Sequence, residues 1–254
     1  MDFSENRSFF AIRPQRAYGV FYEKENAMKK IRIASELTYL AAIVLLALAV
    51  SLLSAADFGV SMIVAPAYLL SLKTGVLTFG QAEYLIQAGV FLLLCLVLRK
   101  FRPIYLCSFG TCLLYGLVLD LWRKIPFFDP QQTPPGSMPL EVRLLLFGAG
   151  FVLTSFSVAL FFKTYLYPQV YDFFVKAVAE RYGIKISLLK TIVDLSCLAI
   201  SLGMTFAFFG RIQGIGWGTL LMALFNGSLI GLFSKLLDRL DFYPAFPRAA
   251  ALFS

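Results

Sequence analysis

Long unbroken runs of apolar residues dominate the chain, and short polar stretches separate them. An α-helix needs roughly 17–25 such residues to cross a bilayer. Six runs meet this requirement, at residues 33–53, 79–98, 104–121, 140–162, 186–208 and 217–233. A transmembrane β-barrel would instead show short segments of alternating apolar and polar residues. The pattern therefore predicts an all-α polytopic membrane protein with six transmembrane helices, the first of which is expected to be a retained span.

Composition supports the membrane assignment. Hydrophobic residues make up 59% of the 254 positions, charged residues only 15%, and the mean hydropathy is +0.76. Soluble domains average about 45–50% apolar and about 25% charged residues. A soluble core of this size cannot bury such an excess, because much of a small domain remains at its surface. A lipid-facing exterior accommodates it.

Two shorter segments do not have the properties of a full span. Residues 60–72 are apolar but short, with Pro66 in their middle, and residues 165–182 have an amphipathic helical pattern. If only the six long runs cross and the N-terminus is inside, 18 of the 23 Lys and Arg residues lie on the cytoplasmic side. A crossing at 60–72 would weaken this bias, which is typical of cytoplasmic loops. We therefore expect six crossings of the plasma membrane, with both termini in the cytoplasm.

The two halves of the chain have the same order of elements. Each half has a long span, a short helical segment, a glycine-containing turn and two further spans, and the turns lie at Gly75 and Gly183. The third span of each half opens with the same Gly-Thr pair, which ends at Thr111 and Thr219. This order predicts an internal repeat of three transmembrane helices.

Because three crossings is an odd number, the second repeat must be inverted relative to the first. Each repeat is then expected to contain one additional short helix, re-entrant or interfacial, at residues 60–72 on the outer side and 165–182 on the inner side. Inverted repeats with short helices at matching positions are common in secondary transporters. The predicted organisation is a basic and aromatic cytoplasmic segment (1–32), the first repeat (33–124), a proline-rich outer loop (125–139), the second repeat (140–240) and a cytoplasmic C-terminal tail (241–254).

The order of spans, the two Gly-Thr helix starts and the stretch Leu189-Lys-Thr-Ile-Val-Asp-Leu195 resemble the YczE/YitT-type integral membrane proteins of bacteria. The resemblance covers roughly residues 36–240. It implies the membrane topology, but that family is functionally uncharacterised, so the resemblance implies no activity and no catalytic residues. The long N-terminal segment and the proline-rich loop depart from the family pattern.

Ionisable residues within membrane spans are costly and are candidates for function. Asp194 lies inside the fifth span, and Lys190 is one helical turn earlier, so the two side chains can form a pair. Two interpretations of Asp194 are open: a proton, cation or substrate site, and a packing contact between helices. Glu83 and Gln87 lie on the second span, and Gln87 is near the position that matches Asp194. We expect these groups to converge near the middle of the membrane.

Two further polar residues complete the candidate substrate- or ion-binding set. Asp57 follows the first span, and its side-chain oxygen is expected to cap the next short helix; a gating role is the alternative. Asn226 lies in the middle of the sixth span and is expected to hydrogen-bond to a neighbouring helix.

Several classes of chemistry are excluded or disfavoured. Histidine is absent, which removes Ser-His-Asp and Cys-His sites and the commonest metal ligand. The four cysteines do not have the spacing of a zinc site, and the sequence contains no phosphate-binding loop and no signature of nucleic-acid binding. We therefore expect no enzyme activity, no cofactor, no metal site and no nucleic-acid partner.

The leading hypothesis is a secondary transporter of a small solute, coupled to protons or cations through an intramembrane carboxylate. The alternative is a non-transporting membrane subunit that captures a ligand for, or acts as a scaffold for, a partner complex. The lipid bilayer is the expected environment in both cases, and a homodimer or a complex with a partner membrane protein is compatible with either.

Overall fold

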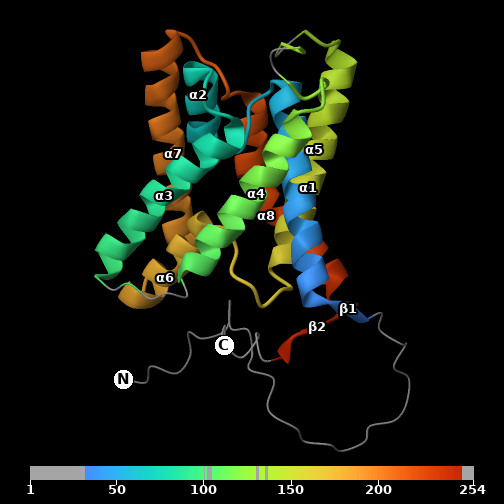
Figure 1. Ribbon diagram of the computed structural model, residues 1–254, viewed down its shortest axis with the longest axis vertical. Coiled ribbons are helices and arrows are strands. Elements are labelled where there is room, and N and C mark those ends of the chain that lie inside the picture. Colours follow the sequence, from blue (N-terminus) through green and yellow to red (C-terminus); the bar gives the residue numbers. More distant parts are fainter. Residues whose placement is uncertain (1–31, 100, 102–104, 130–131, 135–136, 248–254) are drawn as a thin grey trace, which may run out of the picture.

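The computed structural model describes residues 32–99, 101, 105–129, 132–134 and 137–247. The predicted N-terminal segment therefore lies outside the described residues, apart from Arg32. The described chain forms eight helices and two short strands (Figure 1): β1 (Arg32–Ala34), α1 (Ser35–Ala56), α2 (Ala65–Thr74), α3 (Phe79–Leu98), α4 (Leu106–Arg123), α5 (Leu140–Phe161), α6 (Val170–Tyr182), α7 (Ile186–Phe209), α8 (Trp217–Leu237) and β2 (Asp241–Tyr243).

Six of these helices are long and apolar enough to cross a membrane: α1, α3, α4, α5, α7 and α8. Their bounds agree with the six predicted runs to within a few residues, so the prediction of a helical multi-pass protein is confirmed. The two ambiguous segments become the short helices α2 and α6. In Figure 1, α2 lies near one end of the bundle and α6 near the other, on the side of β1 and β2.

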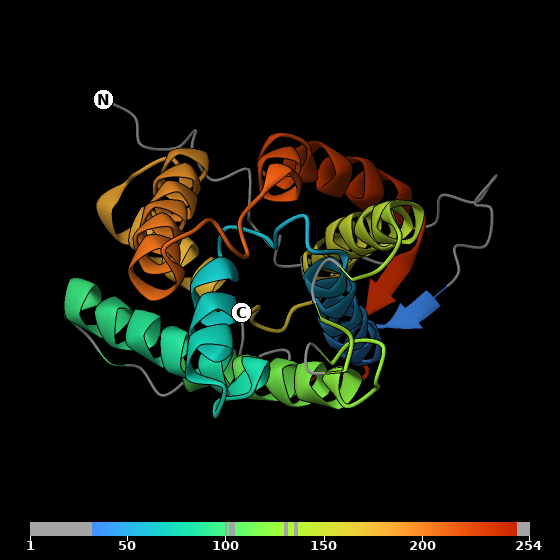
Figure 2. The ribbon, with the colours of Figure 1, turned by 90° about the horizontal axis from the view of Figure 1, so that it is seen from above.

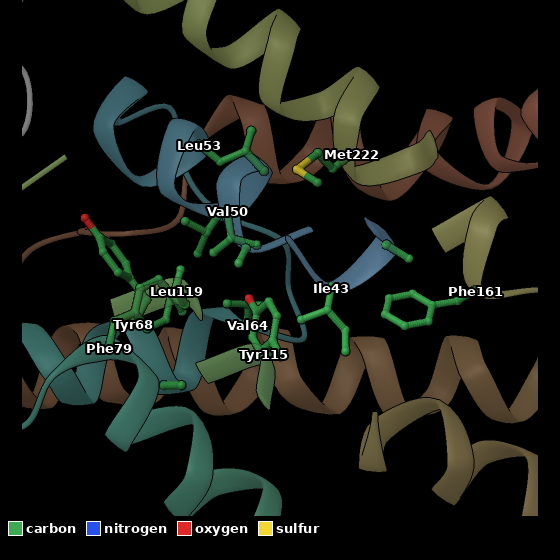
Figure 3. Close-up of a cluster of buried hydrophobic side chains, with 14 of the residues drawn as sticks. Ile43, Val50, Leu53, Val64, Tyr68, Phe79, Tyr115, Leu119, Phe161 and Met222 are labelled. Carbon is green, nitrogen blue, oxygen red and sulfur yellow. The ribbon is translucent and has the colours of Figure 1, made fainter. Parts of the chain in front are cut away.

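The main hydrophobic core surrounds α1, which packs along α4 and α5. In Figure 3, Ile43, Val50 and Leu53 of α1 lie among side chains of other helices, including Tyr115, Phe161 and Met222. Half of the most apolar stretch of α1 is buried, against 11% of the corresponding stretches of α7 and α8. The α1 helix is therefore the centre of the fold, whereas α7 and α8 present most of their apolar surface to the surroundings, as spans in contact with lipid do.

The Gly-Thr pairs that suggested a repeat make equivalent contacts. The Thr219 hydroxyl of α8 donates to the Val60 carbonyl at 2.7 Å, in the segment that links α1 to α2. The Thr111 hydroxyl of α4 donates to the Tyr167 carbonyl at 2.9 Å, in the segment that links α5 to α6. Each threonine thus binds the non-helical segment that precedes the short helix of the other half.

We predict that Thr219→Val lowers the free energy of unfolding by roughly 1–3 kcal/mol, because a buried carbonyl loses its side-chain donor. Thr219 is 2% exposed and Val60 is 1% exposed, so water cannot readily replace the bond. Thermal melting in detergent measures the effect. Thr74→Val, at an exposed threonine of α2, is the matched control and is expected to melt close to the wild type.

One local prediction at the start of α2 is wrong. Asp57 does not cap the short helix: it is the left-handed C-cap residue of α1, whereas α2 begins eight residues later with Val64 as its N-cap and no side-chain cap. Pro66 does not interrupt α2 but lies in its first turn. There a proline has no intrahelical donor to remove, so it favours helix initiation.

The first turn of α3 is hydrogen-bonded to α4. Thr78 and Gln81 form a capping box at the start of α3, and Asp120 of α4 accepts hydrogen bonds from the Thr78 hydroxyl at 2.5 Å and the Gly80 N–H at 2.8 Å. Figure 2 shows α3 and α4 in contact and following one another along one edge of the molecule. The corresponding pair of the second half, α7 and α8, stands apart, and α8 packs against α5 instead.

The two ends of the described chain meet at the same end of the bundle. β1 pairs in parallel with β2, a small sheet that the sequence did not predict, and Arg32 forms an ion pair with Asp241 at 3.2 Å. The Glu36 carboxylate accepts hydrogen bonds from the backbone N–H groups of Ala245 and Phe246. This placement agrees with an even number of crossings. The cytoplasmic location of both ends stays a prediction.

Candidate functional site

A buried polar cluster forms where α3 meets the start of α6. Glu83 lies about 6 Å along α3 from its first residue, at 1.5 Å of rise per residue, and is completely buried. Its Oε2 atom accepts hydrogen bonds from Gln87 Nε2 at 3.1 Å and from the Tyr171 hydroxyl at 3.4 Å. Glu83 and Gln87, which the sequence singled out together, are thus in direct contact on one face of α3.

Gln87 connects this carboxylate to the first residues of α6. Its Nε2 also donates to Gln169 Oε1 at 3.1 Å, while its Oε1 accepts from the Val170 N–H at 3.2 Å. Gln169 is the N-cap residue of α6 and makes no side-chain cap of its own. Gln87 therefore supplies from another helix the acceptor that a capping side chain would normally supply.

The cluster contains more hydrogen-bonding capacity than its members use. Three of its buried side-chain atoms make no hydrogen bond within the described chain: Glu83 Oε1, Gln169 Nε2 and the Tyr115 hydroxyl. Tyr115 lies on α4 and is close enough to be influenced by the charge of Glu83. Buried polar atoms are normally paired with protein or water, so one oxygen of the carboxylate and two further unpaired atoms of the cluster leave it with unused capacity to bind a polar group.

The seventh helix brings a second polar feature to the same region. Lys190, Asp194, Cys197, Ser201 and Thr205 follow one another at helical spacing, and we call this set the α7 stripe. The stripe lies on α7, which packs against α6, the helix whose start contacts the Glu83 cluster. Ser201 Oγ, completely buried, makes no hydrogen bond within the described chain.

The structure gives Lys190 a different partner from the one that spacing suggested. Lys190 Nζ lies 3.2 Å from Asp172 Oδ1 of α6, while Asp194 is a more distant electrostatic neighbour. Gln87 is likewise bonded to Glu83, Gln169 and Val170 rather than to Asp194. The hydrogen bonds of Gln87 thus gather around Glu83, and Asp194 belongs to the charged group on the part of α7 that faces α6.

The remaining two candidates lie outside the Glu83 cluster. Asn226 Oδ1 accepts a hydrogen bond from Ser155 Oγ of α5 at 2.8 Å, so the expected contact between helices exists. Asp57 Oδ2 lies 3.5 Å from Arg143 of α5, whose guanidinium also donates to the Ala56 and Asp57 carbonyls. Cations are favourable at a helix C-terminus, so this arrangement stabilises the end of α1.

Asp57→Asn is expected to melt at the same temperature as the wild type or higher at pH 7. Burial raises the pKa of the Asp57 carboxyl above its usual range, and Arg143 only partly opposes this. The folded state therefore holds the proton more tightly than the unfolded chain, and the carboxyl costs stability as the pH rises through the raised pKa. Asparagine removes that cost and tolerates the left-handed φ of 54°.

Asp57→Ala provides the contrast. Alanine also removes the charge, but it tolerates a left-handed conformation poorly, at a cost of about 1–2 kcal/mol. Melting curves of both variants between pH 4 and pH 8 measure the effect. A destabilised asparagine variant at pH 7 would mean that the ion pair with Arg143 outweighs the burial of the carboxyl.

Three members of the cluster were not predicted: Tyr115, Gln169 and Tyr171. Tyr115 and Tyr171 have the appearance of ordinary aromatic residues in apolar or amphipathic stretches, and Gln169 lies in a connecting segment. One signal in the sequence was Pro168, which lies inside the amphipathic stretch at residues 165–182 and disfavours a helix that continues through it. Among the residues that the structure describes, no group of three Cys, Asp or Glu side chains could hold a metal ion.

Six helices of membrane-spanning length and composition define a polytopic helical membrane protein. Within that class, the chain belongs to a family of unknown function, DUF6198, whose sequence model matches residues 33–235. No curated protein and no solved structure matches the chain. The family agrees with the expectation of an uncharacterised membrane family, and the more specific YczE/YitT-type resemblance stays a prediction.

Proposed function

We propose that the protein is a proton-coupled secondary transporter of a small solute, with Glu83 as the coupling carboxylate. The observation that carries the proposal is the completely buried Glu83 side chain, whose Oε1 makes no hydrogen bond within the described chain. A charged group in a membrane span is costly and is retained where it has a function. Sequence reasoning favoured Asp194, but the greater burial and the unpaired oxygen favour Glu83.

The surroundings of Glu83 suit a group that alternates between two protonation states. The carboxylate form is supported by Gln87, by the Tyr171 hydroxyl and by the nearby N-terminus of α6, where unpaired N–H groups give a positive partial charge. The protonated form is supported by burial, which disfavours charge. A group balanced between these effects can release its proton when a solute binds and recover it when the solute leaves.

The α7 stripe provides polar groups along the path that a solute would take. It extends from Lys190, near the end of the bundle that holds α6, to Thr205, one turn before the end of α7. Cys197 lies between the two, in electrostatic contact with Glu83. Polar side chains in spans commonly mark the routes of substrates and protons.

The arrangement of the two halves supports alternating access. The equivalent contacts of Thr111 and Thr219 suit an inverted repeat, and the departure from symmetry lies in one helix pair: α3 packs along α4, whereas α7 stands apart from α8. In a protein of two inverted repeats, exchanging the conformations of the repeats opens the opposite side. We infer that the second state has α7 packed on α8, with α3 released from α4.

Reconstitution tests the proposal. Purified protein is placed in liposomes with a trapped pH-sensitive dye and a pH gradient, and a panel of amines, carboxylates, sugars and amino acids is added in turn. At least one chemical class is expected to dissipate the gradient with saturable kinetics. If no class moves protons and the protein co-purifies with a partner membrane protein, the non-transporting subunit is the correct interpretation.

A further inference from the structure

We propose that the solute of the Glu83 cluster is a protonated amine, which exchanges with the proton on Glu83. The inference rests on the proposed transport function, because it assigns the class of solute at the same site. In each exchange, one proton leaves the carboxyl as one ammonium group arrives, so the site contains one compensating positive charge in both states.

The first argument for an amine is the charge balance around Glu83. The titratable side chains in electrostatic contact with Glu83 are two tyrosines and two cysteines rather than cations: Cys112 and Tyr115 from α4, Tyr171 from α6 and Cys197 from α7. The four ion pairs of the described residues occupy Arg32, Arg143, Lys163 and Lys190, and none includes Glu83. A buried carboxylate is expensive unless it is paired, and here the protein provides no cationic partner among the described residues. We take the compensating positive charge, a proton or a cation, to arrive from solution.

The second argument for an amine is the hydrogen-bonding pattern of Glu83. Protonation alone brings no hydrogen-bond donor to Glu83 Oε1, which accepts no hydrogen bond within the described chain. An ammonium group supplies both the positive charge and an N–H donor directed at this oxygen. Such charge-assisted bonds are about twice as strong as neutral ones. A carboxylate or phosphate ligand would instead repel Glu83.

The third argument concerns the other buried residues of the cluster. Tyr115 and Tyr171 are 1% and 3% exposed, and Tyr171 directs its hydroxyl at Glu83. The Tyr115 hydroxyl makes no hydrogen bond within the described chain, and neither does Gln169 Nε2, which can donate to an oxygen atom of the solute. The site therefore favours an amine that carries a hydroxyl or carbonyl group over one that is purely hydrocarbon.

A matched set of ligands tests the amine assignment. The melting temperature of the purified full-length protein in detergent is measured with benzylamine, benzyl alcohol and benzoate, which differ mainly in charge. Benzylamine is expected to raise the melting temperature by mass action, and more at pH 8 than at pH 6, because protons compete for Glu83. Ethanolamine is expected to bind more tightly than propylamine.

Two variants of the cluster and one control variant show where the amine binds. Glu83→Gln is expected to weaken amine binding by about tenfold or more, as the loss of a charge-assisted contact implies, while Glu141→Gln, at an exposed position of α5, retains it. Tyr115→Phe removes the unpaired hydroxyl, keeps the ring, and is expected to weaken binding less. It also locates the site should Glu83→Gln fail to fold.

The outcomes separate the two levels of the proposal. No stabilisation by any amine, or amine binding unchanged in Glu83→Gln, overturns the amine assignment. Glu83-dependent binding of benzoate or of a neutral solute overturns it as well, but leaves the transport proposal standing. Glu83-dependent amine binding without any proton flux in liposomes supports the site and argues against transport.

Discussion

Replacement of Glu83 by glutamine is expected to reduce proton-driven solute flux to the level of protein-free liposomes. The amide keeps the size of the side chain and an oxygen that accepts hydrogen bonds from Gln87 and Tyr171. It cannot bind or release a proton, so the exchange that couples solute to proton is lost. The variant is expected to fold and to purify like the wild type. Flux is measured with the trapped dye under the same gradient.

Two matched variants make this result specific. Glu141→Gln removes an exposed carboxylate from the first turn of α5 and is expected to leave flux unchanged. Asp194→Asn removes the partly buried carboxylate of the α7 stripe, whose electrostatic neighbours are Lys190 and Asp172, and is expected to slow flux without abolishing it. Normal flux in Glu83→Gln together with complete loss in Asp194→Asn would show that the coupling carboxylate is Asp194.

Gly59→Ala is expected to cost about 3 kcal/mol or more of unfolding free energy, the largest stability effect that we predict. Gly59 has a φ of +100°, which L-residues rarely adopt, and this strain alone costs about 1–2 kcal/mol. A Cβ atom would also lie 2.5 Å from the backbone nitrogen of Gly216 and 2.4 Å from Thr219 Oγ1. The backbone of the α8 start cannot yield without releasing the contact between the two halves.

Gly75→Ala separates the two causes. Gly75 also has a positive φ, of +63°, but a Cβ atom there would meet nothing within 4 Å. Its cost is expected to be the conformational one alone, about 1–2 kcal/mol. Melting of both variants in detergent gives the comparison. Equal losses would mean that the approach of Gly59 to Gly216 does not limit stability.

The membrane helices could be predicted closely because their signal is local. A run of about 20 apolar residues is long enough to cross the bilayer whatever its neighbours are, and the basic residues weigh against further crossings at residues 60–72 and 165–182. The same local signal places Glu83 and Gln87 one turn apart on one helix face. The sequence alone was therefore sufficient to make both residues candidates.

The other half of the site depends on long-range folding. Gln169 and Tyr171 reach Glu83 because the segment after α5 brings the start of α6 to α3, more than 80 residues earlier in the chain. No periodicity contains that information. The errors at Asp57 and Lys190 have the same origin, because each side chain finds its ion-pair partner on another helix, at Arg143 and Asp172, whereas spacing reveals partners on its own helix alone.

Only part of the α7 stripe could be predicted from the sequence. Lys190 and Asp194 attract attention as charges in a span, but Ser201 and Thr205 are unremarkable in sequence, since serine and threonine often bond to their own helix. Ser201 becomes notable only because its buried hydroxyl makes no hydrogen bond within the described chain.

Difference infrared spectroscopy of the protonated carboxyl band, recorded as the pH is raised across the neutral range, tests the central role of Glu83 most directly. We predict a carboxylic-acid band in the wild type that disappears as the pH rises, that is absent from Glu83→Gln, and that persists in Asp194→Asn. A band that is unchanged in Glu83→Gln, or that is lost only in Asp194→Asn, would contradict the assignment of Glu83 as the group that binds and releases the proton.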